Sequence, residues 1–154
     1  MEPTFRVAQV TDLDTVLVLM QELFVEDQLP DQRPFDSVRA RSALSDLLND
    51  SLRGTVWLVC NGEAVVGYLA LTFGYSLEFH GRDAFIDEFF IRPTNRRQGW
   101  GTHAMEHAET VARSEDVRAI NLEVGRGNIA AQAFYRRAGY ADHDRYLMTK
   151  WIER

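Results

Sequence analysis

The spacing of apolar residues changes along the chain, and this change limits the fold more than any other feature. Over residues 13–48 the apolar side chains recur at helical intervals in two runs, with two prolines between them. Over residues 55–91 they form runs typical of strands, and Asn61-Gly62 marks a hairpin turn. Helix, strand and helix patterns follow, and residues 145–151 are expected to form a last strand. This order predicts an α+β fold with a mixed sheet.

Several residues are expected to mark the ends of the helices. Thr11 is the expected N-cap of the first helix, and Asp36 or Ser37 that of the second, which should end near Asn49. Gly139 should close the short helix over residues 131–138, because glycine accepts the left-handed backbone that often ends a helix.

Composition narrows the class of protein. A chain of 154 residues, of which 45% are hydrophobic, is long enough for one well-buried core, so a single domain over residues 1–154 is expected. A net charge of −6 disfavours nucleic acid as a partner. No apolar run approaches the roughly 18 residues of a membrane helix. The lone cysteine, Cys60, is expected in the core, which fits a cytoplasmic protein that works away from membranes.

The most informative segment follows the strand that ends at Ile91. It is a basic loop containing Arg96 and Arg97, and it leads into a predicted helix through Gly99 and Gly101. Glycines let the backbone approach an anion, and the unpaired N–H groups at a helix N-terminus donate to it. The segment therefore predicts a phosphate-binding site in an otherwise acidic chain.

Three motifs resemble those of the GNAT family of N-acetyltransferases. Arg96-x-x-Gly99-x-Gly101 resembles its pyrophosphate loop, and residues 86–93 resemble its splayed central strand. Downstream, residues 128–140 resemble its N-x-x-A-x-x-F/L-Y-x-x-x-G-F/Y signature. The resemblance covers nearly the whole chain and is strong over residues 84–140. It departs from the family pattern at Arg97, where glycine is usual, and at Trp100, where isoleucine or leucine is usual.

The resemblance implies a fold and an activity. It implies α/β/α layers, with a mixed, mostly antiparallel sheet, a splayed central strand and flanking helices. It also implies direct transfer of an acetyl group from acetyl-CoA to a primary amine of a small molecule or a peptide, with no metal ion. A homodimer is left open. Residues 87–91 resemble diamine acetyltransferases locally, but short strand matches do not fix the substrate.

The family's residue roles carry over position by position. The backbone of residues 89–91 would bind the pantetheine arm, the loop would bind the pyrophosphate, and Tyr135 would lie beside the sulfur and protonate the leaving thiolate. Asn128 could instead be only an N-cap, and Tyr135 only a core residue. The expected coenzyme-binding residues are Phe89, Phe90, Ile91, Arg96, Arg97, Gln98, Gly99, Trp100, Gly101, Thr102, Asn128, Ala131 and Tyr135.

Asp87 and Glu88 interrupt an apolar strand, and one of them is expected to be the general base. Buried carboxylates are costly unless they are paired or have raised pKa values, which suits a base near neutral pH. Strand alternation would send them to opposite faces unless a bulge intervenes, so at most one should face the amine. Family position favours Asp87, whereas Glu88 has the longer reach. Glu78 is a further candidate for the acceptor pocket.

Other functions stay open at this point. The chain could be a non-catalytic acyl-CoA sensor. Gly99-x-Gly101-x-x-Ala104, with Glu123 as the acid, also fits the fingerprint of a dinucleotide-binding oxidoreductase, although the glycines do not directly follow a strand. Residues 103–107 read H-x-x-E-H, a zinc-peptidase pattern, but no third ligand is indicated, so His103 and His107 are expected to be exposed helix residues.

Overall fold

The computed structural model describes residues 1–152, which divide into two compact units. The first unit, Met1–Glu123, contains the sheet and three of the helices, and the second unit begins at Val124. The predicted single domain extends over residues 1–154, and its last two residues lie outside the described part. The extent of the domain stays a prediction.

The sheet has five strands in the described chain, and their spatial order is the order of the sequence. The pairings from β1 to β4 are antiparallel, whereas β4 and β5 run parallel. The predicted hairpin joins the second and third strands, because Asn61 pairs with Ala64. The mixed, mostly antiparallel sheet is therefore confirmed. Its strands are β1 (Thr4–Val7), β2 (Gly54–Asn61), β3 (Ala64–Ser76), β4 (Gly81–Ile91) and β5 (Ala119–Leu122).

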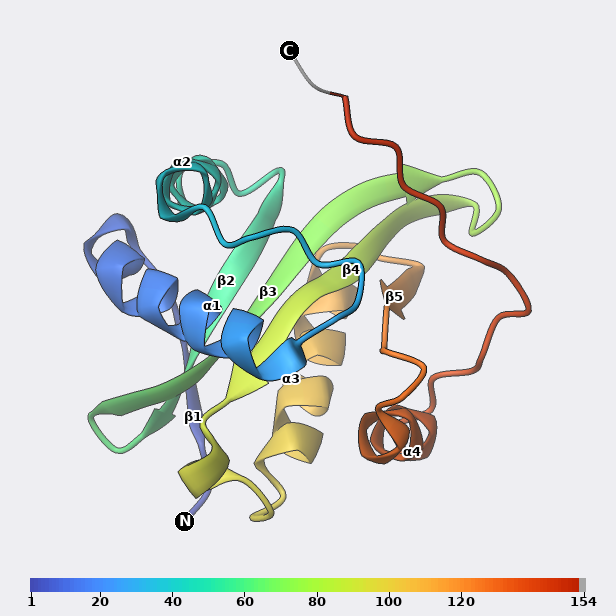
Figure 1. The fold of residues 1–154 in the computed structure, drawn as a ribbon. Coiled ribbons are helices and arrows are strands. Elements are labelled where there is room, and N and C mark those ends of the chain that lie inside the picture. Colours follow the sequence, from blue (N-terminus) through green and yellow to red (C-terminus); the bar gives the residue numbers. More distant parts are fainter. Residues whose placement is uncertain (153–154) are drawn as a thin grey trace. The chain divides into compact units, whose positions relative to one another are not determined.

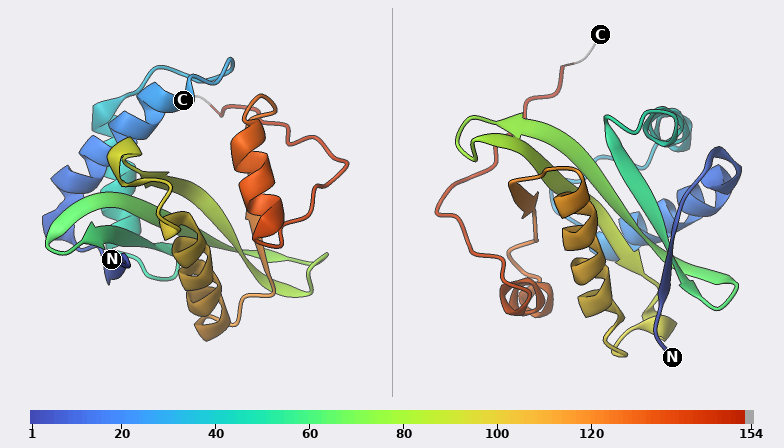
Figure 2. Two further views of the ribbon diagram at one scale, coloured as in Figure 1. Left: turned by 90° about the horizontal axis from the view of Figure 1, so that it is seen from below. Right: turned by 180° about the vertical axis from the view of Figure 1, so that it is seen from behind.

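Helices cover both faces of this sheet. Figures 1 and 2 show α1 (Leu13–Asp27) and α2 (Ser37–Leu48) on one face and α3 (Trp100–Ser114) on the other. Val16, Leu19 and Leu44 bury the first two helices against the sheet. On the other face α3 buries six residues, Trp100, Ala104, Met105, Ala108, Val111 and Ala112. This arrangement confirms the layered α+β fold. No helix in residues 1–152 is long and apolar enough to cross a bilayer.

The helix ends follow local hydrogen bonding. The Asp36 carboxylate accepts hydrogen bonds from the N–H groups of Val38 and Arg39, so Asp36 caps α2 as expected. The prediction of Thr11 as the cap of α1 is wrong: a short 3-10 turn ends at Asp12, which is the N-cap. Asp12 instead pairs with Arg6 and accepts from the N–H of Gln9.

The second unit contains α4 (Ile129–Arg137). Gly139 follows with a φ of 96°, the left-handed conformation that was expected after this helix. The prediction of a last strand over residues 145–151 is wrong, because this segment forms no strand in the described chain. Tyr146, Met148 and Trp151 are exposed there. An alternating pattern becomes a strand only when another strand satisfies its backbone hydrogen bonds.

The close approach of β3 and β4 at Gly67 gives a test of the fold. A Cβ at Gly67 would lie 2.3 Å from the carbonyl oxygen of Phe90 and 3.0 Å from the Cα of Ile91. Gly67→Ala should therefore force the strands apart and lower the free energy of unfolding by about 1–3 kcal/mol, as overpacking typically does. Urea denaturation measures the change.

Gly127→Ala is the matched control, because a Cβ there would meet no atom within 4 Å. Its stability should stay within about 0.5 kcal/mol of the wild type. Equal stability of the two variants would contradict the observed contact between β3 and β4.

Candidate active site

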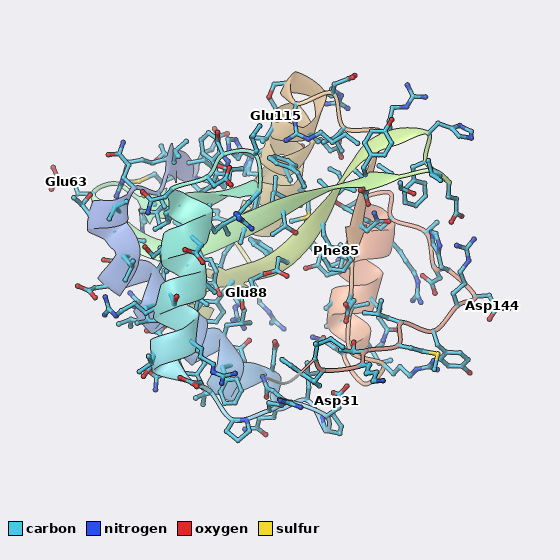
Figure 3. The ribbon with its side chains drawn as sticks, turned by 90° about the horizontal axis from the view of Figure 1, so that it is seen from above. Asp31, Glu63, Phe85, Glu88, Glu115 and Asp144 are labelled. Carbon is cyan, nitrogen blue, oxygen red and sulfur yellow. The ribbon has the colours of Figure 1, made fainter. Side chains whose placement is uncertain are left out.

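A β-bulge in β4 brings two carboxylates into one pocket. Glu88 pairs with Ala70 and Ile86 pairs with Leu71, so Asp87 is an extra residue in the ladder. The bulge interrupts the alternation of side chains, and both Asp87 and Glu88 line a pocket of about 490 Å³. Figure 3 shows Glu88 on the face of the sheet that carries α2. In a regular strand, only one of these two side chains would face the α2 side of the sheet, as expected. At the bulge the alternation is interrupted, and both side chains line the same pocket.

Glu88 is held by a tyrosine from the neighbouring strand. The Tyr68 hydroxyl donates a hydrogen bond of 2.6 Å to Glu88 Oε2, and Tyr68 is 1% exposed. Burial raises the pKa of Glu88 to about 7, and the nearby carboxylates of Asp87 and Asp27 add to the increase. The hydrogen bond from Tyr68 acts the other way, because it stabilises the ionised carboxylate. Glu88 can therefore exchange a proton near neutral pH.

Asp87 lies beside Glu88 but is more accessible to solvent. The walls of the pocket still remove part of its hydration, and this burial raises its pKa. Asp46 of α2 adds a third carboxylate to the lining, and Arg53 is paired with Asp50 at 3.0 Å. The pocket is thus suited to a cation and to the removal of a proton from it.

Apolar side chains form most of the rest of this pocket, and the sequence patterns did not indicate most of its lining. Tyr68 stands within a run of strand residues and Asp46 within the second predicted helix, and no local signal in the sequence marks either of them as a site residue. Glu78, which was a candidate, lies on the β3–β4 turn and is not among the described residues that line the pocket. The apolar lining comes mainly from Val16, Met20, Ala43, Leu44, Leu47, Val56 and Ala70.

The second edge of β4 is open beside this pocket. β5 pairs with β4 only from Asp83 to Ile86, and its last residue is Leu122. From Asp87 to Ile91, β4 has a strand partner on the β3 side alone among the described residues. This is the splay that the family resemblance implied. The backbone of residues 89–91 can accept another extended chain there.

The predicted phosphate loop adopts the required backbone. A 3-10 turn (Pro93–Asn95) follows β4, and α3 begins at Trp100 with Gly99 as its N-cap at a φ of 81°. Arg97 has a φ of 60°, a left-handed conformation that favours glycine. The first N–H groups of α3 point out of its N-terminus. Such a backbone could hold a diphosphate, and the predicted coenzyme contacts of Arg97, Gln98, Gly99, Gly101 and Thr102 stay predictions.

Arginine side chains fasten this loop to α1. Arg92 donates two hydrogen bonds of 2.9 Å to Glu22, and the Nη2 of Arg96 lies 2.8 Å from Glu26. The Nε of Arg96 also donates to the Ile91 carbonyl at 2.6 Å. The Arg96 side chain thus anchors the loop, and its predicted contact with the coenzyme stays a prediction.

Trp100, the second departure from the family pattern, is a packing residue in this structure. It is 1% exposed and packs with Val59, Val66 and Ile91. Its indole N–H donates to the carbonyl of Met1 at 3.1 Å. The side chain therefore faces the core, while its backbone N–H belongs to the first turn of α3.

The second unit contains the other predicted coenzyme residues. Asn128 caps α4 by accepting a hydrogen bond of 3.1 Å from the N–H of Ala131. The ring of Tyr135 packs edge-on against Phe134 and Tyr140, at centroid distances of 5.1 and 5.8 Å. The cap is the structural role that was considered for Asn128. The coenzyme contacts of Asn128, Ala131 and Tyr135 stay predictions.

Two competing motifs have structural explanations. The glycines of the dinucleotide fingerprint do not follow the strand directly, since the 3-10 turn and residues 96–98 lie between Ile91 and Gly99. In the H-x-x-E-H segment, His107 is half-buried and stacks on Phe5 at a centroid distance of 4.5 Å, so the expectation that it is exposed is wrong. No three metal-binding side chains cluster in residues 1–152.

The splayed sheet and the loop at the N-terminus of α3 define an acyltransferase fold. The sequence profile of the Acetyltransferase (GNAT) family matches residues 19–140, so the chain belongs to this family of enzymes. This match confirms the resemblance to the GNAT family. It excludes the alternative that the chain is a dinucleotide-binding oxidoreductase.

Individual relatives agree with this assignment. A thialysine N-epsilon-acetyltransferase of Bos taurus is 26% identical over 149 residues, which is 89% of this chain and 83% of the bovine protein. A solved integron cassette protein from the Cole Harbour Salt Marsh metagenome is 29% identical, with a TM-score of 0.83 over 97% of this chain and 91% of its own. A predicted acetyltransferase of Clostridium acetobutylicum, solved with acetyl-CoA, has a TM-score of 0.81 at 16% identity, with 96% of each chain covered.

The hydrogen bond between Tyr68 and Glu88 can be tested by removing one hydroxyl. Tyr68→Phe should raise the pKa of Glu88 by about 1, because the ionised carboxylate loses a donor that lies in a site of low polarity. Titration of the Glu88 side-chain carboxyl carbon by NMR measures the change.

Tyr75→Phe is the control, since Tyr75 lies on the same strand and is exposed. It should leave the titration of Glu88 where it is in the wild type. A lower or unchanged pKa of Glu88 in Tyr68→Phe would contradict the hydrogen bond.

Proposed function

We propose that this acetyltransferase moves an acetyl group from acetyl-CoA to a primary amine of a small molecule by direct transfer. The observation that carries the proposal is the position of Asp87 and Glu88, which share a pocket beside the open edge of β4. The bovine relative is named for the acetylation of an amine, and the clostridial neighbour was solved with acetyl-CoA. We also expect a free small molecule in the cytoplasm as the acceptor, rather than nucleic acid or a membrane.

Two surfaces of the first unit would be complementary to acetyl-CoA. The open β4 edge at residues 89–91 suits the amide-bearing pantetheine arm, which would add to the sheet as an extra strand. The loop from Arg97 to Thr102 suits the pyrophosphate through backbone N–H groups and the dipole of α3. When bound, acetyl-CoA supplies a reactive thioester.

The side chains of the pocket would prepare the amine for attack. An alkyl ammonium has a pKa of about 10.4 and must lose a proton before its nitrogen can attack a thioester. The carboxylates first attract the ammonium, and the Asp87–Glu88 pair then accepts the proton. A backbone N–H of the splayed β4 would stabilise the charge that develops on the carbonyl oxygen. Tyr135 would donate a proton to the departing thiolate.

The pH dependence of the rate distinguishes the roles of Asp87 and Glu88. The pKa of Glu88 is about 7, and a base works only when deprotonated, so kcat/KM should rise as the pH increases through about 7 if Glu88 is the base. One of Asp87→Asn and Glu88→Gln should lose about 100-fold or more in kcat/KM together with this limb, and the other should lose little.

The measurement uses thiol release from acetyl-CoA, with the fastest substrate from a panel of small primary amines. Retention of wild-type kcat/KM by both variants over the whole pH range would exclude the pair as the base. A protein that binds acetyl-CoA and releases no thiol with any amine would instead be a non-catalytic acyl-CoA sensor.

The role of Tyr135 can be tested with Tyr135→Phe. A phenol with a pKa near 10 stays protonated at neutral pH and can donate to a thiolate, so kcat should fall by roughly ten- to ten-thousandfold when the hydroxyl is removed. The ring that packs against Phe134 and Tyr140 is retained, so the melting temperature and acetyl-CoA affinity should change little.

Tyr140→Phe makes the same deletion on the neighbouring ring of this unit and should keep normal turnover. Normal kcat in Tyr135→Phe, with reduced stability, would make Tyr135 a packing residue and leave protonation of the thiolate to water.

A further inference from the structure

The loop that leads into α3 contains the predicted diphosphate site, but its own backbone does little to hold its shape. Arg97, Gln98 and Gly99 are exposed, and their N–H groups form no hydrogen bond with another described backbone group. Such N–H groups can bind an anion. A loop without internal hydrogen bonds also loses conformational entropy when a ligand orders it. The shape of the unliganded loop therefore depends on the segments at its two ends.

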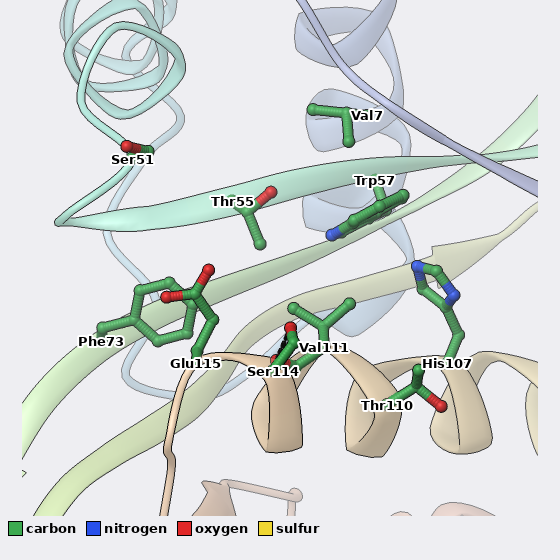
Figure 4. Close-up of a pocket in the computed structure, with 10 residues that line it drawn as sticks. All are labelled: Val7, Ser51, Thr55, Trp57, Phe73, His107, Thr110, Val111, Ser114 and Glu115. Atoms are coloured by element: carbon green, nitrogen blue, oxygen red, sulfur yellow. Dashed lines mark hydrogen bonds between the residues drawn. The ribbon is translucent and has the colours of Figure 1, made fainter.

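The α3 end of the loop is fixed by packing. Trp100, Ala104 and Ala108 are buried along the helix, beginning at its first residue. Figure 4 shows His107 of α3 beside Trp57 of β2, and their rings meet edge to face at a centroid distance of 4.3 Å. The helix is therefore held against the sheet over most of its length.

The β4 end of the loop is held by an ion pair with α1. Arg92 follows the last residue of β4 and donates hydrogen bonds of 2.9 Å to both carboxylate oxygens of Glu22. These bonds lower the pKa of Glu22, so both side chains are charged at neutral pH. The backbone N–H of Arg92 donates to Val66 at 2.9 Å, and its carbonyl accepts from Asn95 at 2.9 Å. Arg92 thus joins α1, β3 and the turn before the loop.

A second ion pair holds the loop one turn further along α1. The Nη2 of Arg96 lies 2.8 Å from Glu26, and its Nε donates to the Ile91 carbonyl at 2.6 Å. The guanidinium also lies over the Phe90 ring, 5.4 Å from its centroid. The side chains of both pairs are between 37% and 42% exposed, so one pair alone would stabilise the loop only weakly. Two pairs on successive turns of one helix constrain it together.

We propose that Glu22 and Glu26 are positioning residues for acetyl-CoA. Through their two arginine partners they hold the loop of residues 97–99 in the shape that receives the diphosphate. The carboxylates act through the arginines, because a negative side chain in contact with a diphosphate would repel it. A loop that is already ordered loses less entropy on binding, so its affinity is higher. This inference rests on the proposed function, since it requires the loop to bind the diphosphate of acetyl-CoA.

Positioning and charge have opposite consequences for the affinity. Glu22→Gln leaves Arg92 without its partner and adds net positive charge near an anion site, so a purely electrostatic role predicts tighter binding of CoA. Arg92→Lys keeps the charge and loses the planar fork that binds both carboxylate oxygens. If Glu22 positions the loop, both variants should instead weaken CoA binding by about three- to tenfold. Glu26→Gln should act in the same direction.

The experiment compares CoA with pantetheine, which retains the arm that would bind β4 and lacks the diphosphate. Calorimetry measures the Kd of CoA, and NMR shifts of the backbone amides of residues 89–91 measure the Kd of pantetheine. Glu22→Gln and Arg92→Lys should leave the affinity for pantetheine near its wild-type value, whereas a general loss of structure would weaken both ligands. In turnover, the KM for acetyl-CoA should rise in Glu22→Gln with little change in kcat.

Glu109→Gln is the matched control. It breaks an ion pair of 3.0 Å with Arg113, in the half of α3 that lies away from Gly99. Its affinities for CoA and for pantetheine should both equal those of the wild type.

Two results would overturn the inference. One is CoA binding by Glu22→Gln and Arg92→Lys that is as tight as in the wild type or tighter. The other is an equal loss of affinity for CoA and pantetheine, which would make the ion pairs general stabilising contacts. If Glu22→Gln does not fold, Arg92→Lys alone decides. A wild-type protein that binds CoA no more tightly than pantetheine would instead contradict the proposed coenzyme site, so the two failures are distinguishable.

Discussion

The candidate active site depends on β4 having two different neighbours. On one side β3 pairs with it in an antiparallel ladder along its whole length, while on the other side β5 pairs with only four residues, Asp83 to Ile86. β4 therefore keeps its pairing with β3 where its second edge is open. An unpaired strand edge is usually a liability for aggregation, and a short, partly covered one can instead recognise a ligand backbone. The open edge, the carboxylates and the phosphate loop follow one another along the same strand and the turn after it.

The bulge at Asp87 determines the chemistry that this strand can support. A regular strand would place one carboxylate against α3 and the other against α1 and α2, so each would be buried among apolar side chains. The extra residue puts both into one pocket, and Tyr68 from β3 stabilises the inner one. Burial opposes ionisation while the tyrosine favours it, and the balance leaves Glu88 with a pKa of about 7. The irregular pairing of β3 with β4 thus determines both the positions of the two carboxylates and their acid–base properties.

Sequence patterns predicted the elements well and the contacts between them poorly. The two N-terminal helices, the Asn61-Gly62 hairpin and the loop before α3 all follow from local signals, namely period, turn residues and glycines. The bulge does not, because it depends on which residues of β3 lie opposite Asp87. Tyr68 was missed for the same reason, since its hydroxyl acts on a residue 20 positions away. The strand expected at residues 145–151 failed because alternation does not supply a strand partner.

The two departures from the family pattern show how the phosphate loop tolerates unusual residues. Arg97 adopts a left-handed backbone that glycine would adopt at lower cost, a difference of roughly 1 kcal/mol. The ion pairs of Arg92 and Arg96 with α1 fix the turn just before it, so the loop keeps its shape despite that cost. The Arg97 side chain thereby adds a positive charge beside the proposed diphosphate site of an otherwise acidic protein. Trp100 occupies its position by burying its ring and donating its N–H to Met1, which leaves the backbone of the first turn of α3 to determine the shape of the anion site.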